Sequence, residues 1–315
     1  MSKRIVFMGT PDFAVKSLDA IVQAGYDVAA VVTVPDRQTG RGLKVTFSPV
    51  KEYALQHNLP LLQPEKLRDP QFLSELESLK AELFVVVAFR MLPQSVWAMP
   101  PLGTFNLHAS LLPQYRGAAP INWAIINGEK ETGVTTFLLN EKIDEGRILM
   151  QRTTPISDND NAESLHDRLA EMGAALTVET LDSLFAGTIH PQPQPEVKQL
   201  KLAPKIFKPD CAIDWTRNGN DIRNFVRGLS PYPAATTTMI DNKGENVSMK
   251  IYDVDFEKGV TDVLGTIKTD EKKELKIATK DGFIKILSLQ ISGKKKITAD
   301  EFLRGYKIKD WKLNI

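Results

Sequence analysis

The sequence is poor in the residues and segments that several large classes of protein require. It holds one cysteine, Cys211, which excludes an internal disulfide framework and a cysteine-based metal cluster. Its longest apolar run, residues 83–89, has the length of a strand and is far too short to span a membrane. Near the N-terminus, Pro11 and Asp12 interrupt any signal-peptide core. We therefore expect a cytoplasmic protein that makes no use of a membrane.

Sequence motifs of common enzyme classes are also missing. Gly9 stands alone after the first apolar run, and without a G-x-G-x-x-G pattern a bound dinucleotide is not expected. There is no G-x-S-x-G motif, which argues against a serine hydrolase of the α/β type. The four histidines lie at no ligand spacing from one another or from the cysteine, so no metal site is predicted.

Charge is distributed unevenly along a chain whose formal net charge is only +1. Residues 190–315 hold 23 Lys and Arg against 17 Asp and Glu, a net charge of +6, whereas the remainder holds 17 against 22, a net charge of −5. A basic second half beside an acidic first half indicates a polyanionic partner for the second half. A lysine-rich surface that only keeps the protein soluble would give the same counts.

The first part of the chain alternates strands with helices. The apolar run at residues 5–8 is typical of a buried parallel strand, and a helical pattern at 13–24 comes directly after it. The loop at 35–44 shows no clear period. This order predicts an α/β fold, a Rossmann-like doubly wound sheet. Further strands are expected at 28–34, 61–62, 83–88, 104–108, 134–139 and 148–153, and helices at 49–57, 70–79, 120–127 and 162–185.

The pattern changes after residue 190. Alternating prolines at 190–195 indicate an extended linker, and the chain beyond this linker is rich in short strands. Asp281-Gly282 predicts a hairpin with a type I′ turn, and Thr298 with Glu301 predicts a capping box for a last short helix. We expect a C-terminal β-barrel of OB type. The predicted domains are 1–189 (catalytic), 190–207 (linker) and 208–315 (OB-like), with strands in the last at 236–240, 247–254, 265–267, 275–279 and 283–289.

The strongest functional signal lies in the stretch 104–113. Residues 104–108 alternate polar and apolar side chains, so Asn106 and His108 point to one face of the strand. In an open α/β sheet, ligands bind outside the carboxyl ends of the strands, and this pair lies at such an end. A neutral imidazole there suits acid–base catalysis or the stabilisation of developing negative charge. A hydrogen-bonded structural histidine is the alternative.

Asp144 lies in the connection between two expected strands and adds a carboxylate to this set. Asp-x-Gly is also ordinary turn chemistry, so a structural role is the competing interpretation. An amide, an imidazole and a carboxylate without a serine nucleophile suit a reaction in which the substrate supplies its own nucleophile.

Several motifs together resemble the methionyl-tRNA formyltransferases, a branch of the folate-dependent formyltransferase superfamily. The similarity extends beyond the linker and covers nearly the whole chain. The family usually has a tyrosine-glycine pair where this chain has Phe89-Arg90. The motifs are Phe7-Met8-Gly9-Thr10-Pro11-Asp12-Phe13-Ala14, Pro35-Asp36-Arg37 with Gly40-Arg41-Gly42, Asn106 to Pro113, Arg116 to Ile121, Glu131 to Thr135, Ile213-Asp214-Trp215 and Pro231-Tyr232-Pro233.

The resemblance implies a reaction and a set of residues. The formyl group of 10-formyltetrahydrofolate, a cosubstrate and not a permanently bound cofactor, would pass to the amino group of methionine on initiator tRNA. Asn106 and His108 would donate hydrogen bonds to the oxyanion, each worth about 3 kcal/mol. Asp144 would orient His108 or accept the amine's proton through water. The implied folate contacts are Ser110, Leu111, Leu112, Pro113, Phe89, Met91 and Leu92.

Two regions are expected to contact the tRNA. Arg37, Arg41 and Lys44 lie in a glycine-containing loop, and the C-terminal domain carries clusters at 272–273 and 294–296. We expect a monomer. A folate-dependent formyltransferase or hydrolase that acts on a small molecule is one alternative, and a non-catalytic tRNA-binding protein is another. The basic second domain counts against the first alternative, and the intact trio counts against the second.

Overall fold

The computed structural model describes residues 3–39, 44–260 and 262–314, which form two compact units. The first unit comprises Met1–Gly117, Thr132–Thr154 and His166–Leu202. The second comprises Ala118–Glu131, Pro155–Leu165 and Ala203–Ile315. Each unit therefore contains segments that are far apart in the sequence.

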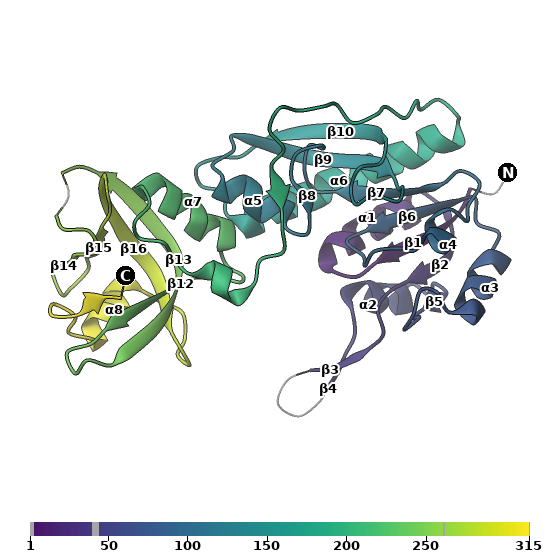
Figure 1. Ribbon diagram of the computed structural model, residues 1–315. Coiled ribbons are helices and arrows are strands. Elements are labelled where there is room, and N and C mark those ends of the chain that lie inside the picture. The colour runs from purple at the N-terminus through teal and green to yellow at the C-terminus, as the bar shows by residue number, and fades with distance from the viewer. Residues whose placement is uncertain (1–2, 40–43, 261, 315) are drawn as a thin grey trace. The chain divides into compact units, whose positions relative to one another are not determined.

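The described residues of the first unit form a seven-stranded sheet (Figure 1). Its inner strands pair in parallel, β2 with β1, β1 with β6 and β6 with β7, and β9 runs antiparallel to β7. The order confirms the predicted Rossmann-like sheet. The strands, from edge to edge, are β10 (Ile148–Pro155), β9 (Glu131–Leu138), β7 (Thr104–His108), β6 (Leu83–Val87), β1 (Arg4–Gly9), β2 (Asp27–Val32) and β5 (Leu61–Leu62).

Helices cover both faces of this sheet, as a doubly wound fold requires. On one face Val6 and Val86 pack with side chains of α3 (Pro70–Ser78) and α4 (Gln94–Trp97). On the other face the side chain of Leu107 lies against Gly173 of α6 (Ala162–Phe185), where a Cβ would come within 2.7 Å of a Leu107 methyl carbon. The remaining helices of the first unit are α1 (Asp12–Gln23) and α2 (Pro49–Gln56).

Local start and stop signals account for several helix ends. Ser48 caps α2, because its hydroxyl accepts a hydrogen bond from the Lys51 amide at 3.1 Å. Gly25, after α1, has a φ of +78°, a left-handed conformation that glycine adopts without strain. The loop predicted at 35–44 is wrong in part: β3 (Arg37–Thr39) and β4 (Lys44–Thr46) pair antiparallel as a hairpin. A strand of three residues is too short to show hydrophobic periodicity, so the sequence does not indicate these two strands.

The second unit is built on an antiparallel sheet that bends into a nearly closed barrel of OB type, as predicted. Among its described residues it contains the α-helices α5 (Pro120–Ile126), α7 (Gly219–Leu229) and α8 (Ala299–Gly305). Its core includes Trp215, Ile251 and Phe302, which are at most 2% exposed. Its main strands are, in order, β14 (Ile267–Thr269), β15 (Leu275–Ala278), β16 (Gly282–Ile291), β13 (Asn246–Lys258), β12 (Ala235–Ile240) and β18 (Lys312–Leu313).

Two local predictions in this unit have different outcomes. The Thr298 amide donates to the Glu301 carboxylate at 3.0 Å, as the capping box predicts. The β15–β16 hairpin exists, but the type I′ turn at Asp281-Gly282 is wrong, because neither residue has a positive φ. Gly282 instead begins β16, and a Cβ there would lie 2.1 Å from the Glu257 carbonyl oxygen of β13. The absence of a side chain at Gly282 therefore allows β16 to approach β13 closely.

Residues 192–201, which we call the strap, lie within the predicted linker and belong to the first unit. Gln192 exchanges two backbone hydrogen bonds with Ile148 of β10, both of 2.8 Å. The segment 118–131, by contrast, belongs to the second unit although it lies within the predicted catalytic domain. The domain boundaries at 189 and 208 stay a prediction. No helix in the described part of the chain is long and apolar enough to cross a membrane.

Candidate active site

Asn106 and His108 lie at the carboxyl end of β7, a strand that β6 flanks in parallel. Phe105 and Leu107 are buried at 0% and 3% exposure, so they anchor the strand from within the sheet's packing layers. The ring of His108 meets Phe137 edge-on, with 6.5 Å between centroids. Packing on neighbouring strands therefore sets the direction of both polar side chains.

The hydrogen bonding of His108 determines which ring nitrogen can react. Its Nε2 lies 2.8 Å from the Tyr115 carbonyl oxygen. A carbonyl only accepts hydrogen bonds, so Nε2 carries a proton in this arrangement. In a neutral ring the lone pair then lies on Nδ1, which can accept a proton from a substrate.

Asn106 differs from its neighbour because it is partly exposed. Within the described residues, no group of the protein forms a hydrogen bond with its side-chain amide. A partly exposed amide without an internal partner is available to a ligand, so this side chain can donate to an oxygen at the strand end.

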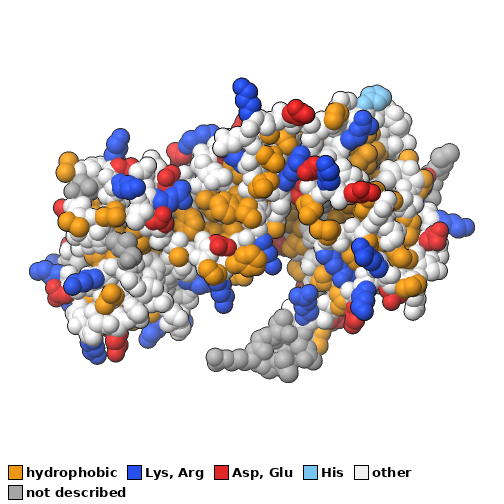
Figure 2. Space-filling view, in the orientation of Figure 1, with side chains coloured by type: hydrophobic (Ala, Val, Ile, Leu, Met, Phe, Trp, Pro, Cys, Tyr) orange, Lys and Arg blue, Asp and Glu red, His pale blue; other side chains and the backbone are white. Residues whose placement is uncertain are grey.

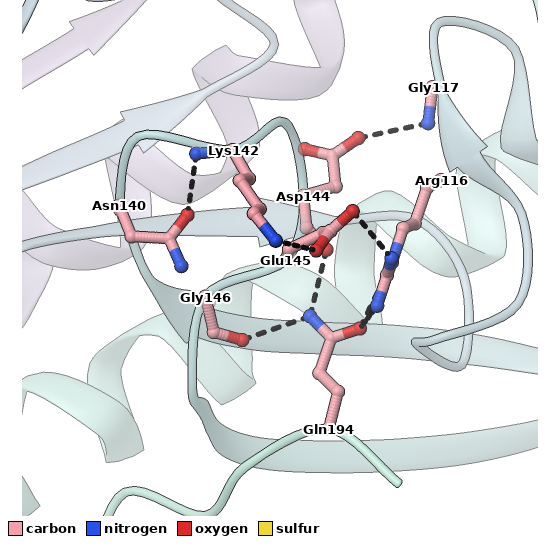
Figure 3. Close-up of polar contacts among 8 residues, drawn as sticks. All are labelled: Arg116, Gly117, Asn140, Lys142, Asp144, Glu145, Gly146 and Gln194. Carbon is pink, nitrogen blue, oxygen red and sulfur yellow. Dashed lines mark hydrogen bonds and ion pairs between the residues drawn. The ribbon is translucent and has the colours of Figure 1, made fainter. Parts of the chain in front are cut away.

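Asp144 lies in the connection between β9 and β10 and has a φ of +53°. Its carboxylate accepts a hydrogen bond of 2.9 Å from the Gly117 amide (Figure 3). Among the residues that the structure describes, no hydrogen bond or ion pair joins Asp144 to His108. The ring is therefore oriented by the Tyr115 carbonyl, and the role predicted for Asp144 in orienting it stays a prediction.

The loop after β7 is held mainly by its own backbone and by β9. The Thr135 hydroxyl donates to the Ser110 carbonyl at 2.6 Å, and the Ser110 hydroxyl donates to the Gln114 carbonyl at 2.7 Å. Of the four residues implied as folate contacts here, Leu111 alone is partly exposed, whereas Ser110, Leu112 and Pro113 are buried. Of these four residues, Leu111 is therefore the one that a ligand can reach directly.

The loop after β6 carries the other residues implied for folate. Phe89 is partly exposed, Met91 is 72% exposed and Leu92 is 8% exposed, so a ligand can reach Phe89 and Met91 directly. Arg90 donates to the backbone carbonyls of Glu65 and Pro64. Burial, and then the nearby charge of Arg37, lowers the pKa of the Arg90 guanidinium. The departure from the family's tyrosine-glycine pair thus serves to tie this loop to the one before α3.

The three residues predicted to contact tRNA lie in or beside the β3–β4 hairpin. Arg37 begins β3 and is exposed, Lys44 begins β4, and Arg41 lies outside the described residues. At the base of the hairpin Lys51 donates to Asp36 at 2.6 Å. This bond, together with a second one from Gln63, lowers the pKa of the Asp36 carboxyl. These hydrogen bonds therefore fix the base of the β3–β4 hairpin.

Comparison with known proteins places this geometry in a family. The family described as formyl transferase matches residues 3–181, and its C-terminal domain matches residues 205–307. A methionyl-tRNA formyltransferase from Bacteroides thetaiotaomicron is 53% identical over 317 residues, which cover 99% of this chain and 98% of that protein. Another from Parabacteroides distasonis is 54% identical over 310 residues, 96% of each chain. The chain belongs to the methionyl-tRNA formyltransferase family.

A solved structure supports the fold of this family across both units. The N-formyltransferase from Helicobacter canadensis, in complex with folinic acid and dTDP-3-aminofucose, matches with a TM-score of 0.65 and 22% identity. The match covers 94% of this chain and 100% of that one. At this identity the likeness shows the fold alone, and it agrees with a Rossmann-like sheet followed by a barrel.

The sequence did not indicate which groups hold His108 and the Asp144 loop in place. Tyr115 supplies the carbonyl that fixes His108, and Arg116 and Gln194 contact the Asp144 loop (Figure 3). Gln194 falls where alternating prolines indicate a linker. The sequence around Gln194 alternates proline and glutamine, and this pattern does not indicate a partner fifty residues away.

Proposed function

We propose that the protein transfers the formyl group of 10-formyltetrahydrofolate to the α-amino group of methionine on initiator tRNA. The observation that carries this proposal is identity above 50% over nearly the full length of relatives named methionyl-tRNA formyltransferase. An available amide and an imidazole on β7, with a carboxylate in the connection between β9 and β10, support it independently. The product would be N-formylmethionyl-tRNA, which serves translation initiation.

The reaction requires proton transfer but no oxidation or reduction. A bond forms between the methionine nitrogen and the formyl carbon, and the bond from that carbon to N10 of the folate breaks. The amine gives up one proton, and N10 takes up one. Between these events the formyl oxygen carries negative charge, which a positioned donor stabilises by about 3 kcal/mol.

We assign a different task to each residue. Asn106 donates to the developing oxyanion, because its amide is partly exposed and has no partner among the described residues. His108 accepts the amine's proton at Nδ1, since Nε2 donates to Tyr115, and returns it to N10. The donor role predicted for His108 then applies once the ring is protonated. For Asp144 we keep the predicted role, which is to orient His108 or to help accept the amine's proton through water.

Residues 190–315, whose net charge is +6, and the β3–β4 hairpin are the proposed contacts to the tRNA. In Figure 2 the lysines and arginines of the second unit are spread over the visible face, with acidic side chains between them. Such a distribution suits general contact with phosphates rather than one deep site. A monomer in the cytoplasm, without membrane contact, is sufficient for this reaction.

The experiment is transfer of labelled formyl from 10-formyltetrahydrofolate to charged initiator tRNA, compared with uncharged tRNA, charged elongator tRNA and free methionine. We expect label on charged initiator tRNA alone. Equal labelling of free methionine would favour a small-molecule transferase, and formate release without an acceptor would favour a hydrolase. Binding of tRNA without transfer would indicate a non-catalytic protein.

A further inference from the structure

The side chain of Gln194, in the strap, joins two loops of the candidate active site (Figure 3). Its Nε2 donates to the backbone carbonyls of Asp144 at 2.8 Å and Gly146 at 2.9 Å. Its Oε1 accepts from Arg116, at 2.7 Å from Nη2 and 3.2 Å from Nε. All the donors and acceptors of the amide are therefore used.

Further bonds join the same two loops around this amide. Arg116 forms an ion pair of 3.0 Å with Glu145, which is partly sheltered at 38% side-chain exposure. The next residue, Gly117, donates its amide to the Asp144 carboxylate at 2.9 Å. Asp144 holds an uncommon left-handed backbone, which persists when the surroundings determine it. Gln194 binds the carbonyl of that residue and so fixes its peptide.

The strap also holds the loop that orients His108. The Tyr115 amide donates to the Lys201 carbonyl at 2.6 Å. The Gln114 side chain donates to the Gln199 carbonyl at 3.0 Å and accepts from the Lys201 amide at 2.7 Å. The Tyr115 carbonyl in turn accepts a hydrogen bond from Nε2 of the His108 ring. One segment thus supports both the imidazole and the carboxylate.

We propose that Gln194 is a positioning residue for catalysis, which sets Asp144 relative to the loop that holds His108. The inference rests on the proposed function of this site. Gln194 acts through Asp144 and Arg116 and touches no substrate. Only an amide of this length supplies two donors to carbonyls and an acceptor to a guanidinium. A carboxylate at the same place would lose both donors and face two carbonyl oxygens.

The test compares Gln194→Ala, Gln194→Met and Gln194→Glu with the wild-type full-length protein in the formyl-transfer assay. Each should lower kcat roughly 10- to 100-fold, as a displacement of about 1 Å does, with little change in KM for charged initiator tRNA. Gln194→Met keeps the volume, so it separates lost hydrogen bonds from lost packing. Thermal unfolding gives the folded fraction, and kcat is expressed per folded molecule.

Gln192→Ala is the matched control, because the Gln192 side chain contacts only the His190 carbonyl two residues away, as far as the described residues show. It should retain wild-type kcat. The double variant Gln194→Ala with Arg116→Ala should be no slower than the slower single variant, since both belong to one network. Wild-type kcat per folded molecule in Gln194→Met, or fully additive losses, would overturn the proposal. If the wild-type protein folds normally but transfers no formyl group, the proposed function itself is wrong.

Discussion

The two halves of the candidate active site are held in different ways. Asn106 and His108 belong to a strand between two others, and their buried neighbours in β7 lie in the packed layers of the sheet. Asp144 belongs to an irregular connection, and its position depends on hydrogen bonds from Gly117 and Gln194. Secondary structure sets the backbone of the first half, and the Tyr115 carbonyl orients the His108 ring. Hydrogen bonds from distant segments set the second half.

This difference teaches where single substitutions should act. A side chain on a rigid strand can be removed without moving its neighbours, so the loss reports its own chemistry. A side chain on a cross-linked loop is sensitive also to changes in the groups that hold it. Arg37 of the hairpin and the lysines at 294–296 are exposed, and their removal should affect catalysis least.

The largest effect is expected from Asn106→Ala. Loss of an oxyanion donor should lower kcat at least ~100-fold, with little change in KM for charged tRNA. The midpoint of thermal unfolding should not change, because the amide has no partner among the described residues. His108→Ala should lower kcat by a similar factor. Near-normal kcat in either variant would contradict the assignment of the strand pair.

Asp144→Asn should have the next largest effect. Asparagine tolerates the left-handed backbone and can still accept from the Gly117 amide, but it carries no charge. We expect kcat to fall at least about tenfold, equivalent to roughly 1.4 kcal/mol, while the protein still folds. The measurement is single-turnover transfer together with thermal unfolding. Normal activity per folded molecule with a lowered midpoint would make Asp144 structural.

Arg41→Ala tests the hairpin, with Arg37→Ala as a second variant at its described base. Removal of one cation should lower kcat/KM for charged initiator tRNA several-fold and leave folate affinity unchanged, because the hairpin contacts the tRNA alone in this proposal. The two quantities are measured separately, by initial rates and by folate titration. If the hairpin has no role in tRNA binding, both variants will show wild-type kcat/KM and wild-type folate affinity.

The smallest effect on turnover is expected from replacing Lys294, Lys295 and Lys296 together by alanine. The logarithm of tRNA affinity should fall less steeply with the logarithm of salt concentration, by up to about 0.9 per lost phosphate contact. Deletion of residues 208–315 is less informative, since Ile126 of α5 packs in the core of the second unit. An unchanged salt slope would make these lysines a solvated surface.

Most of the fold was predictable from the sequence because its signals are local. The apolar run at 83–87 and the helix at 162–185 appear with the predicted type and nearly the predicted ends. The β3–β4 hairpin and the turn before Gly282 were not predictable. Short strands show little hydrophobic periodicity. In the sequence, a glycine required by the close approach of two strands also looks the same as a glycine required by a turn.

The sequence by itself determined most of the elements, the presence of a Rossmann-like sheet and a barrel, and the common face of Asn106 and His108. Strand alternation depends only on neighbouring residues. Tertiary structure decided which nitrogen of His108 holds the proton, what Asp144 binds, and that Gln194 joins the two loops. Each of these depends on a pairing in space, in the case of Asp144 and Gln194 across 50 residues. Hydrophobic periodicity describes burial along one segment and carries no information about such partners.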